Sequence, residues 1–84
     1  MSYGQELVVN GGSDILPKGV SSYVEVVGDN KDGIMLDSYT AKITKVNGAY
    51  IVTPNAGETR VAIGMSFIEN GELRHLGYYV YEVK

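Results

Sequence analysis

Two runs of alternating apolar and polar residues near the end of the chain predict a long β-hairpin. The runs cover Thr59–Ile68 and Leu73–Lys84, and Glu69-Asn70-Gly71-Glu72 joins them. Asn-Gly suits the two positive-φ positions of a type I′ turn, whose twist matches that of paired strands. Alternate side chains of a strand share a face. We therefore expect the inner face of the hairpin to carry Val61, Ile63, Met65 and Phe67 from the first run and Leu73, Tyr79, Tyr81 and Val83 from the second.

The earlier part of the chain predicts shorter strands separated by turn residues. We expect strands at 6–9, 20–27, 40–46 and 49–53, the last two joined by a second Asn-Gly turn. Ile15-Leu16 precedes Pro17, which has no amide to donate, so this segment is at most an edge strand. Short strands at intervals of about ten residues, with no helical period, are typical of a β-sandwich. The sequence therefore predicts an all-β fold, an antiparallel Ig-like β-sandwich of six or seven short strands.

The alternation also predicts which side chains form the core between the two sheets. In the strand at 20–27, Ser22, Val24 and Val26 share one face, and the valines indicate that this face is buried. The full predicted core comprises Val24, Val26, Ile43, Tyr50, Val52, Val61, Ile63, Met65, Phe67, Tyr79, Tyr81 and Val83.

Length and charge limit the kind of protein this is. A chain of 84 residues forms one small domain, and we expect 1–84 to be a single module of a longer chain. Its net charge of -3 and the lack of a basic cluster argue against nucleic acid or an anionic membrane as partner. No stretch approaches the roughly 18 consecutive apolar residues of a membrane-spanning helix, so we expect no membrane contact by this segment.

Few residues suggest catalytic or metal chemistry. The chain has no cysteine and one histidine, His75, which rules out a zinc site of the usual kind and is expected at the surface. The acidic stretch 28–33 resembles a calcium loop, but Lys31 replaces a ligand and no glutamate closes it, which favours a solvated turn. Asp14 and Asp37 are the carboxylates that could meet at a glycosidase-like separation. We otherwise expect no enzyme, no catalytic residue, no cofactor and no metal.

Exposed tyrosines give the one residue-level hypothesis about function. If Tyr79 and Tyr81 face inward, Tyr78 and Val80 face outward, and Tyr23 or Ile68 is expected nearby. These four residues are the predicted contact patch. If the strand contained a bulge near Gly77, the faces would be swapped and Tyr79 would take the place of Tyr78 in the patch. We favour protein over sugar as the ligand, because sugar-binding sandwiches usually stack sugar on tryptophan as well as tyrosine and this chain has no tryptophan.

The order of segments resembles the repeated periplasmic domains of the GldM/PorM family, from the type IX secretion and gliding motor of Bacteroidetes. The resemblance covers Ile43–Pro54, Gly57, Gly71–Gly77 and the last strand, with Leu16–Val26 similar to the opening segment. It implies a non-catalytic structural module of the periplasm or cell envelope that contacts a neighbouring domain, a second copy or another subunit. A carbohydrate-binding or adhesin-type surface module is the alternative. The matching positions are Gly48, Tyr50, Val52, Pro54, Gly71, Gly77, Tyr81, Val83 and Lys84.

Overall fold

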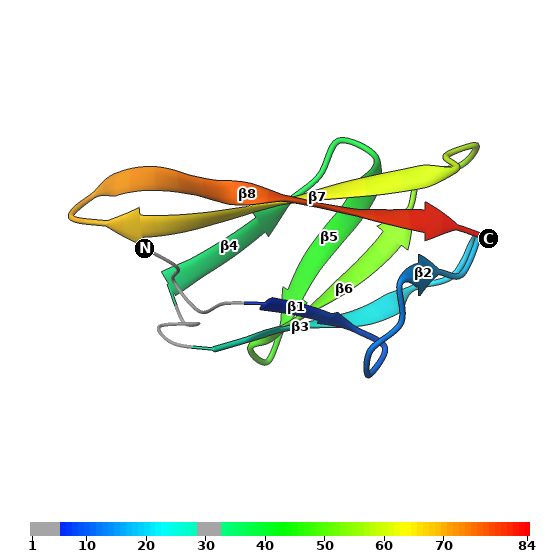
Figure 1. The fold of residues 1–84 in the computed structure, drawn as a ribbon, viewed down its shortest axis with the longest axis horizontal. Helices are drawn as coiled ribbons and strands as arrows, with labels where there is room; N and C mark the ends of the chain where they lie inside the picture. Colours follow the sequence, from blue (N-terminus) through cyan, green and yellow to red (C-terminus); the bar gives the residue numbers. More distant parts are fainter. Residues whose placement is uncertain (1–5, 29–32) are drawn as a thin grey trace.

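A computed structural model describes residues 6–28 and 33–84, and within these ranges the chain is an all-β sandwich (Figure 1). The strands form two sheets of four, which confirms the predicted fold class. The described residues contain eight strands, rather than six or seven. They are β1 (Glu6–Val9), β2 (Ile15–Leu16), β3 (Ser22–Val27), β4 (Ile34–Asp37), β5 (Ala41–Val46), β6 (Ala49–Pro54), β7 (Arg60–Glu69) and β8 (Glu72–Val83).

Each sheet is built around one of the two hairpins. The first sheet has the order β1-β3-β6-β5, with every pair antiparallel. The second sheet has the order β2-β8-β7-β4 and contains the one departure from the antiparallel prediction, because β2 pairs parallel to the end of β8. The two predicted Asn-Gly turns both form, with φ of 48° and 83° at Asn47 and Gly48 and of 53° and 79° at Asn70 and Gly71.

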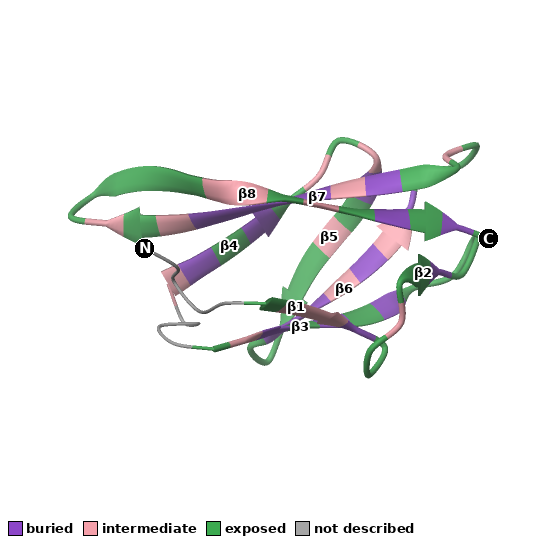
Figure 2. Cartoon of the chain, in the orientation of Figure 1, coloured by how far each residue is buried: buried purple, intermediate pink, exposed green. Residues whose placement is uncertain are grey.

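The core lies between the sheets, where buried positions alternate along the strands (Figure 2). Nine of the twelve predicted core residues are buried. The other three, Ile43, Phe67 and Tyr79, are only half-buried and pack against the edge of this cluster. The Tyr50 hydroxyl donates a hydrogen bond of 2.9 Å to the Ile34 carbonyl, so a β6 side chain crosses the core to reach β4 in the opposite sheet.

Both short edge strands bury more than the sequence indicated. Leu16, in the segment that Pro17 limits to the edge, has no exposed surface. The segment at 34–36, which is not among the predicted strands, pairs with β7 as β4 and buries Ile34 and Leu36. The calcium-loop hypothesis for residues 28–33 falls mainly on residues 29–32, which lie outside the described ranges.

The long hairpin contains a β-bulge that the predicted alternation did not include. Met65 pairs with Gly77, whereas the next residue, Ser66, pairs with His75, so Leu76 is one extra residue in β8. Gly77 has a φ of 152°, a conformation that favours glycine. The bulge reverses which face of the sheet each β8 side chain occupies between the bulge and the turn. Leu73, predicted to face inward, is therefore 65% exposed.

Candidate interaction surface

The outer face of the second sheet carries a band of exposed apolar side chains. Pairing across the sheet places these side chains on neighbouring strands. Ile68 of β7 lies opposite Leu73 of β8. Met35 of β4 lies opposite Ser66 of β7, and Ser66 lies opposite His75 of β8. Tyr78 and Val80 continue the band along β8, opposite Gly64 and Ala62. We call this band the outer stripe. Its members are Met35, Ile68, Leu73, Tyr78 and Val80, which are between 49% and 67% exposed.

Tyr78 is held flat on the sheet by its neighbours. A Cβ built on Gly64 would lie 3.3 Å from the Tyr78 ring and 2.5 Å from the Asp37 carboxylate, so only glycine leaves room for both side chains there. On its other side, the Tyr78 ring meets the His75 ring at a centroid distance of 4.5 Å and an angle of 54°. His75 is exposed, as expected. The packing fixes the ring orientation while leaving its outer surface open to a partner.

The bulge is the reason that Tyr78 and Val80 face outward. The turn pairs Glu69 with Glu72, and an unbroken register from that pair would put Val80 opposite Val61, which is fully buried. The extra residue at Leu76 instead pairs Val61 with Tyr81 and turns Val80 outward. The expected exposure of Tyr78 and Val80 is therefore found, but the expectation that a bulge would swap them inward is wrong.

The four residues of the predicted patch do not lie together. Tyr78, Val80 and Ile68 belong to the second sheet, whereas Tyr23 is in β3 of the first sheet, where it pairs with Ile51. The outer faces of the two sheets point in opposite directions, so Tyr23 cannot contribute to a patch around Tyr78. Sequence reasoning gave the exposure of Tyr23 correctly but had no means of assigning its strand to a sheet.

Met35 and Leu73 are members of the outer stripe that sequence reasoning missed. Met35 alternates with the buried Ile34 and Leu36, a signal that would have placed it on an outer face once the segment was recognised as a strand. Leu73 was assigned to the core because the alternation was carried through the bulge unchanged. Its pairing with Ile68, a residue 50% exposed, shows that the hairpin end is exposed on this face.

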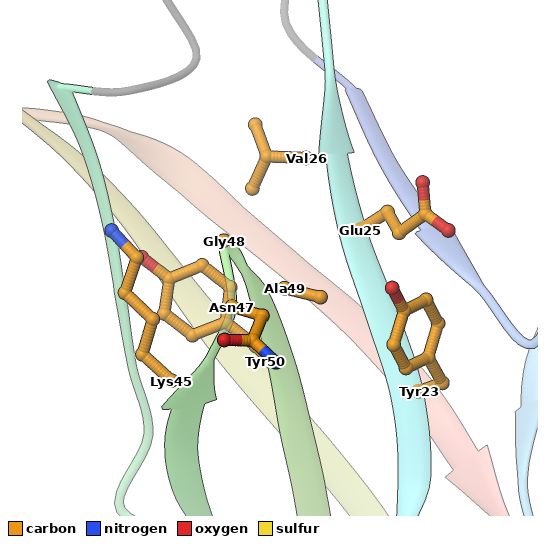
Figure 3. Close-up of a pocket in the computed structure, with 8 residues that line it drawn as sticks. All are labelled: Tyr23, Glu25, Val26, Lys45, Asn47, Gly48, Ala49 and Tyr50. Atoms are coloured by element: carbon orange, nitrogen blue, oxygen red, sulfur yellow. The ribbon is translucent and has the colours of Figure 1, made fainter.

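A polar hollow of about 310 Å³ lies on the first sheet, where β3 diverges from the tip of the β5–β6 hairpin (Figure 3). Tyr23 and Glu25 lie along β3, and Lys45, Asn47 and Tyr50 lie across from them on the hairpin. The Lys45 ammonium is 5.7 Å from the centre of the Tyr50 ring, a cation–π contact. The polar groups come from β3 on one side and from both strands and the turn of the β5–β6 hairpin on the other, and they do not converge on one point in this view.

A second hollow, of about 280 Å³, lies between β1 and β8. Asp14 and Tyr81 are among the residues that line it. Burial raises the pKa of the Tyr81 hydroxyl above its usual range, and the negative charge that Tyr79 and Asp14 can carry adds to the rise. The Tyr81 hydroxyl is therefore neutral at physiological pH and stays so into the alkaline range.

Asp14 and Asp37 do not form a paired site. Asp14 lies one residue before β2, at one edge of the second sheet, and Asp37 ends β4, at the opposite edge. Three strand spacings separate those edges, about 14 Å, which exceeds the roughly 5–10 Å between glycosidase carboxylates. Within the described ranges, no group of three histidine, cysteine or carboxylate side chains is placed to hold a metal ion.

Known proteins do not place this chain in a family. Over residues 6–28 and 33–84 the fold has no helix that is long and apolar enough to cross a membrane. The resemblance to the GldM/PorM domains stays a prediction. No protein-family model, no curated protein and no solved structure matches the chain.

Proposed function

We propose that this chain is a non-catalytic structural and interaction module that contacts another protein through the outer stripe. The carrying observation is that five large apolar side chains, each about half exposed or more, share one face of one sheet. Within this set Ile68 lies opposite Leu73, and Tyr78 and Val80 are neighbours along β8. Contiguous apolar surface of this kind is a common mark of a protein contact site. Tyrosine and methionine, two of the residue types enriched at protein interfaces, are among the five.

The other outer face supports the choice by contrast. On the first sheet, the exposed Tyr23 has Glu25 as its neighbour on the same face of β3, and Lys42 and Thr44 occupy outer positions of β5. Charged and hydroxyl side chains thus interrupt the apolar ones there. The strands of the first sheet expose two large apolar side chains, Tyr23 and Val46, whereas the outer stripe has five. The second sheet is therefore the better docking face.

We also propose the setting that the sequence resemblance implies, an assembly of the bacterial periplasm or cell envelope. The partner is then a neighbouring domain, a second copy of the chain or another subunit of that assembly. Nucleic acid is a poor candidate because the net charge is -3. Immunodetection of the chain in fractionated native cells tests this location, and recovery in the cytosolic fraction alone would refute it.

Site-specific photo-crosslinking in native cells tests the docking face. A photoreactive phenylalanine analogue at Tyr78 should give a discrete crosslinked species, whereas the same analogue at Tyr23, a tyrosine on the opposite face, should not. Introducing Val80→Asp should weaken the crosslink from position 78, since a charge at a residue 63% exposed opposes docking without entering the core. Equal crosslinking from both positions, or a Val80→Asp chain that unfolds, would count against the outer stripe.

Carbohydrate binding is a second candidate, and the hollow beside Tyr23 favours it. Tyr23, Glu25, Lys45 and Asn47 offer an aromatic ring and several hydrogen-bonding groups around one depression. A glycan array followed by calorimetry with the best glycan tests this role. Binding that disappears in Tyr23→Ala and persists in Tyr78→Ala would support the sugar site and displace the protein-contact proposal.

A further inference from the structure

The free edge of β8 is the longest unprotected strand edge in the described part of the chain. β7 pairs with β8 along one side as far as the turn, but on the other side β2 pairs only with Glu82 and Val83 (Figure 1). Among the described residues, no strand pairs with that side of Glu72–Tyr81. An open row of backbone amides and carbonyls is a template for pairing with another strand.

The other edges are shorter or carry charge. β1 and β4 each have four residues. β5 has six, with Lys45 paired to Tyr50, so that its ammonium lies over a ring on the inner side of the edge. Short edge strands and inward-pointing charges are the usual means by which sandwiches prevent edge-to-edge pairing. β8 is longer than these edges, and between Leu73 and Tyr81 it carries the bulge and one charged residue at an inward position, Arg74, which is opposite Phe67 and 3.5 Å from the Glu69 carboxylate.

Hydrogen bonds at the end of β8 show which of its residues point their amides and carbonyls to the free side. Val83 donates to Thr59 on the β7 side, at 2.9 Å, whereas Lys84 donates to Leu16 on the β2 side, at 3.1 Å. Because these directions alternate along a strand, Val80 and Tyr78 point to the free side. They are the same two residues whose side chains lie in the outer stripe.

The bulge makes this row of free groups symmetric about its own centre. Glu72 closes the type I′ turn opposite Glu69, so its backbone groups point to β7. Alternation then sends those of Leu73 and His75 to the free side. The free row therefore contains Leu73 and His75 before the bulge, and Tyr78 and Val80 after it. The extra residue at Leu76 places the centre of this row between Leu76 and Gly77.

We infer that a second copy of this chain pairs with the free edge of β8, antiparallel and about a two-fold axis between Leu76 and Gly77. In this register Leu73 faces Val80 of the second copy, and His75 faces Tyr78 of the second copy. All four have backbone groups that point to the free side and side chains on the outer face, so hydrogen bonds and side chains pair together. The two second sheets become one continuous eight-stranded sheet.

This register uses the stretch of β8 that β2 leaves unpaired. Glu72 faces Tyr81 of the second copy, and the next position along the strand is Glu82, where β2 begins. The register therefore requires the Asn70-Gly71 turn of the second copy to bend away from β8 before it reaches Glu82, where Ile15 of β2 pairs. No pair in this register brings like charges together, because Glu72 and Arg74 face tyrosines.

Two single-cysteine variants test the register directly, since the natural chain contains no cysteine. Leu73→Cys and Val80→Cys, mixed and oxidised, should give disulfide-linked heterodimers, because positions 73 and 80 of different copies are paired. Each variant alone should stay uncrosslinked, since equivalent positions lie seven residues apart along the strand, about 23 Å. Both side chains are more than 60% exposed, so neither change disturbs the core.

Sedimentation of charge variants measures the association itself. The natural chain should sediment as a monomer–dimer equilibrium that shifts to dimer with concentration. Leu73→Lys with Val80→Lys should abolish the dimer by placing like charges opposite each other, whereas Leu73→Glu with Val80→Lys should retain it. A natural chain that stays monomeric at every soluble concentration, or single-cysteine variants that crosslink alone as strongly as the mixture, would overturn the inference. The two proposals are distinguished by the mass of the species crosslinked from position 78, because pairing of β8 edges gives a dimer of this chain whereas docking of another protein through the outer stripe does not.

Discussion

The two Asn-Gly hairpins begin from the same turn chemistry and end differently. In β5–β6 the register set by the turn, with Val46 opposite Ala49, continues without interruption to Ala41 opposite Pro54. In β7–β8 the register set by the turn holds for four pairs and then shifts by one residue at Leu76. The comparison shows that a turn fixes only the pairs close to it. Farther along a long hairpin, the burial of apolar side chains decides which residues face each other.

The shift in β7–β8 reconciles two competing demands. The turn requires Glu69 opposite Glu72, whereas the core requires Tyr79, Tyr81 and Val83 to face inward against β7. These two registers differ by one residue, and a β-bulge is the local structure that absorbs one extra residue. In the shorter β5–β6 hairpin the two demands agree, so no bulge is needed.

Deleting one residue from each hairpin should give the largest difference in stability between two variants. Removal of Ile51 from β6 puts Tyr50 and Val52 out of phase, and we expect the domain to unfold because the loss approaches the total stability of about 5–15 kcal/mol. Removal of Leu76 from β8 makes the register set by the turn coincide with the register set by the core. The domain should therefore stay folded, with a free energy of unfolding lower by about 1–3 kcal/mol because the packing of Leu76 is lost. Circular dichroism and urea denaturation measure both. An unfolded Leu76 deletion would refute the account of the bulge.

Two isoleucines of β7 allow the inner face of the strand to be compared with its outer face. Ile63 is fully buried, whereas Ile68, nearer the turn, is 50% exposed. Ile63→Ala should lower the free energy of unfolding by roughly 2–5 kcal/mol through loss of burial and the cavity left behind. Ile68→Ala should change it by less than about 0.5 kcal/mol. Chemical denaturation of the two variants side by side checks the pair, and similar losses would mean that the facing of β7 is misassigned.

A substitution at the bulge should have an intermediate effect. A Cβ on Gly77 would meet no atom within 4 Å, so Gly77→Ala has no steric clash to relieve. Its φ of 152° is nevertheless one that residues with a side chain rarely adopt. We expect a loss of about 1–3 kcal/mol from backbone strain alone. A variant as stable as the natural chain in urea would show that the bulge relaxes to another conformation.

The smallest expected effect concerns alkaline pH. Burial, with Tyr79 and Asp14, raises the pKa of the Tyr81 hydroxyl in the folded state above its unfolded value of about 10. The stability that the neutral hydroxyl contributes is therefore complete below about pH 10 and is lost as the pH rises through the folded pKa. Tyr81→Phe should flatten the fall in unfolding free energy between about pH 9 and 11. Tyr23→Phe, which removes an exposed hydroxyl, is the control and should leave that fall unchanged.

Part of the candidate surface could be predicted and part could not. Alternation correctly placed Tyr78 and Val80 on the outside, because those residues lie on the same side of the bulge as the inward-facing tyrosines. It misplaced Leu73, which lies on the other side of the bulge. It also grouped Tyr23 with Tyr78, although the two belong to different sheets. Alternation gives the face of each strand, but it carries no information about which strands share a sheet.

The sequence alone determined what depends on short-range chemistry. Period-two alternation predicted the strands other than β4, and the Asn-Gly pairs predicted both turns, since these follow from backbone geometry within a few residues. The tertiary structure decided the parallel pairing of β2 with β8, the burial of Leu16 and the bulge at Leu76. Each of these depends on contacts between residues far apart in the chain, where burial against the opposite sheet outweighs the register that the local turn favours.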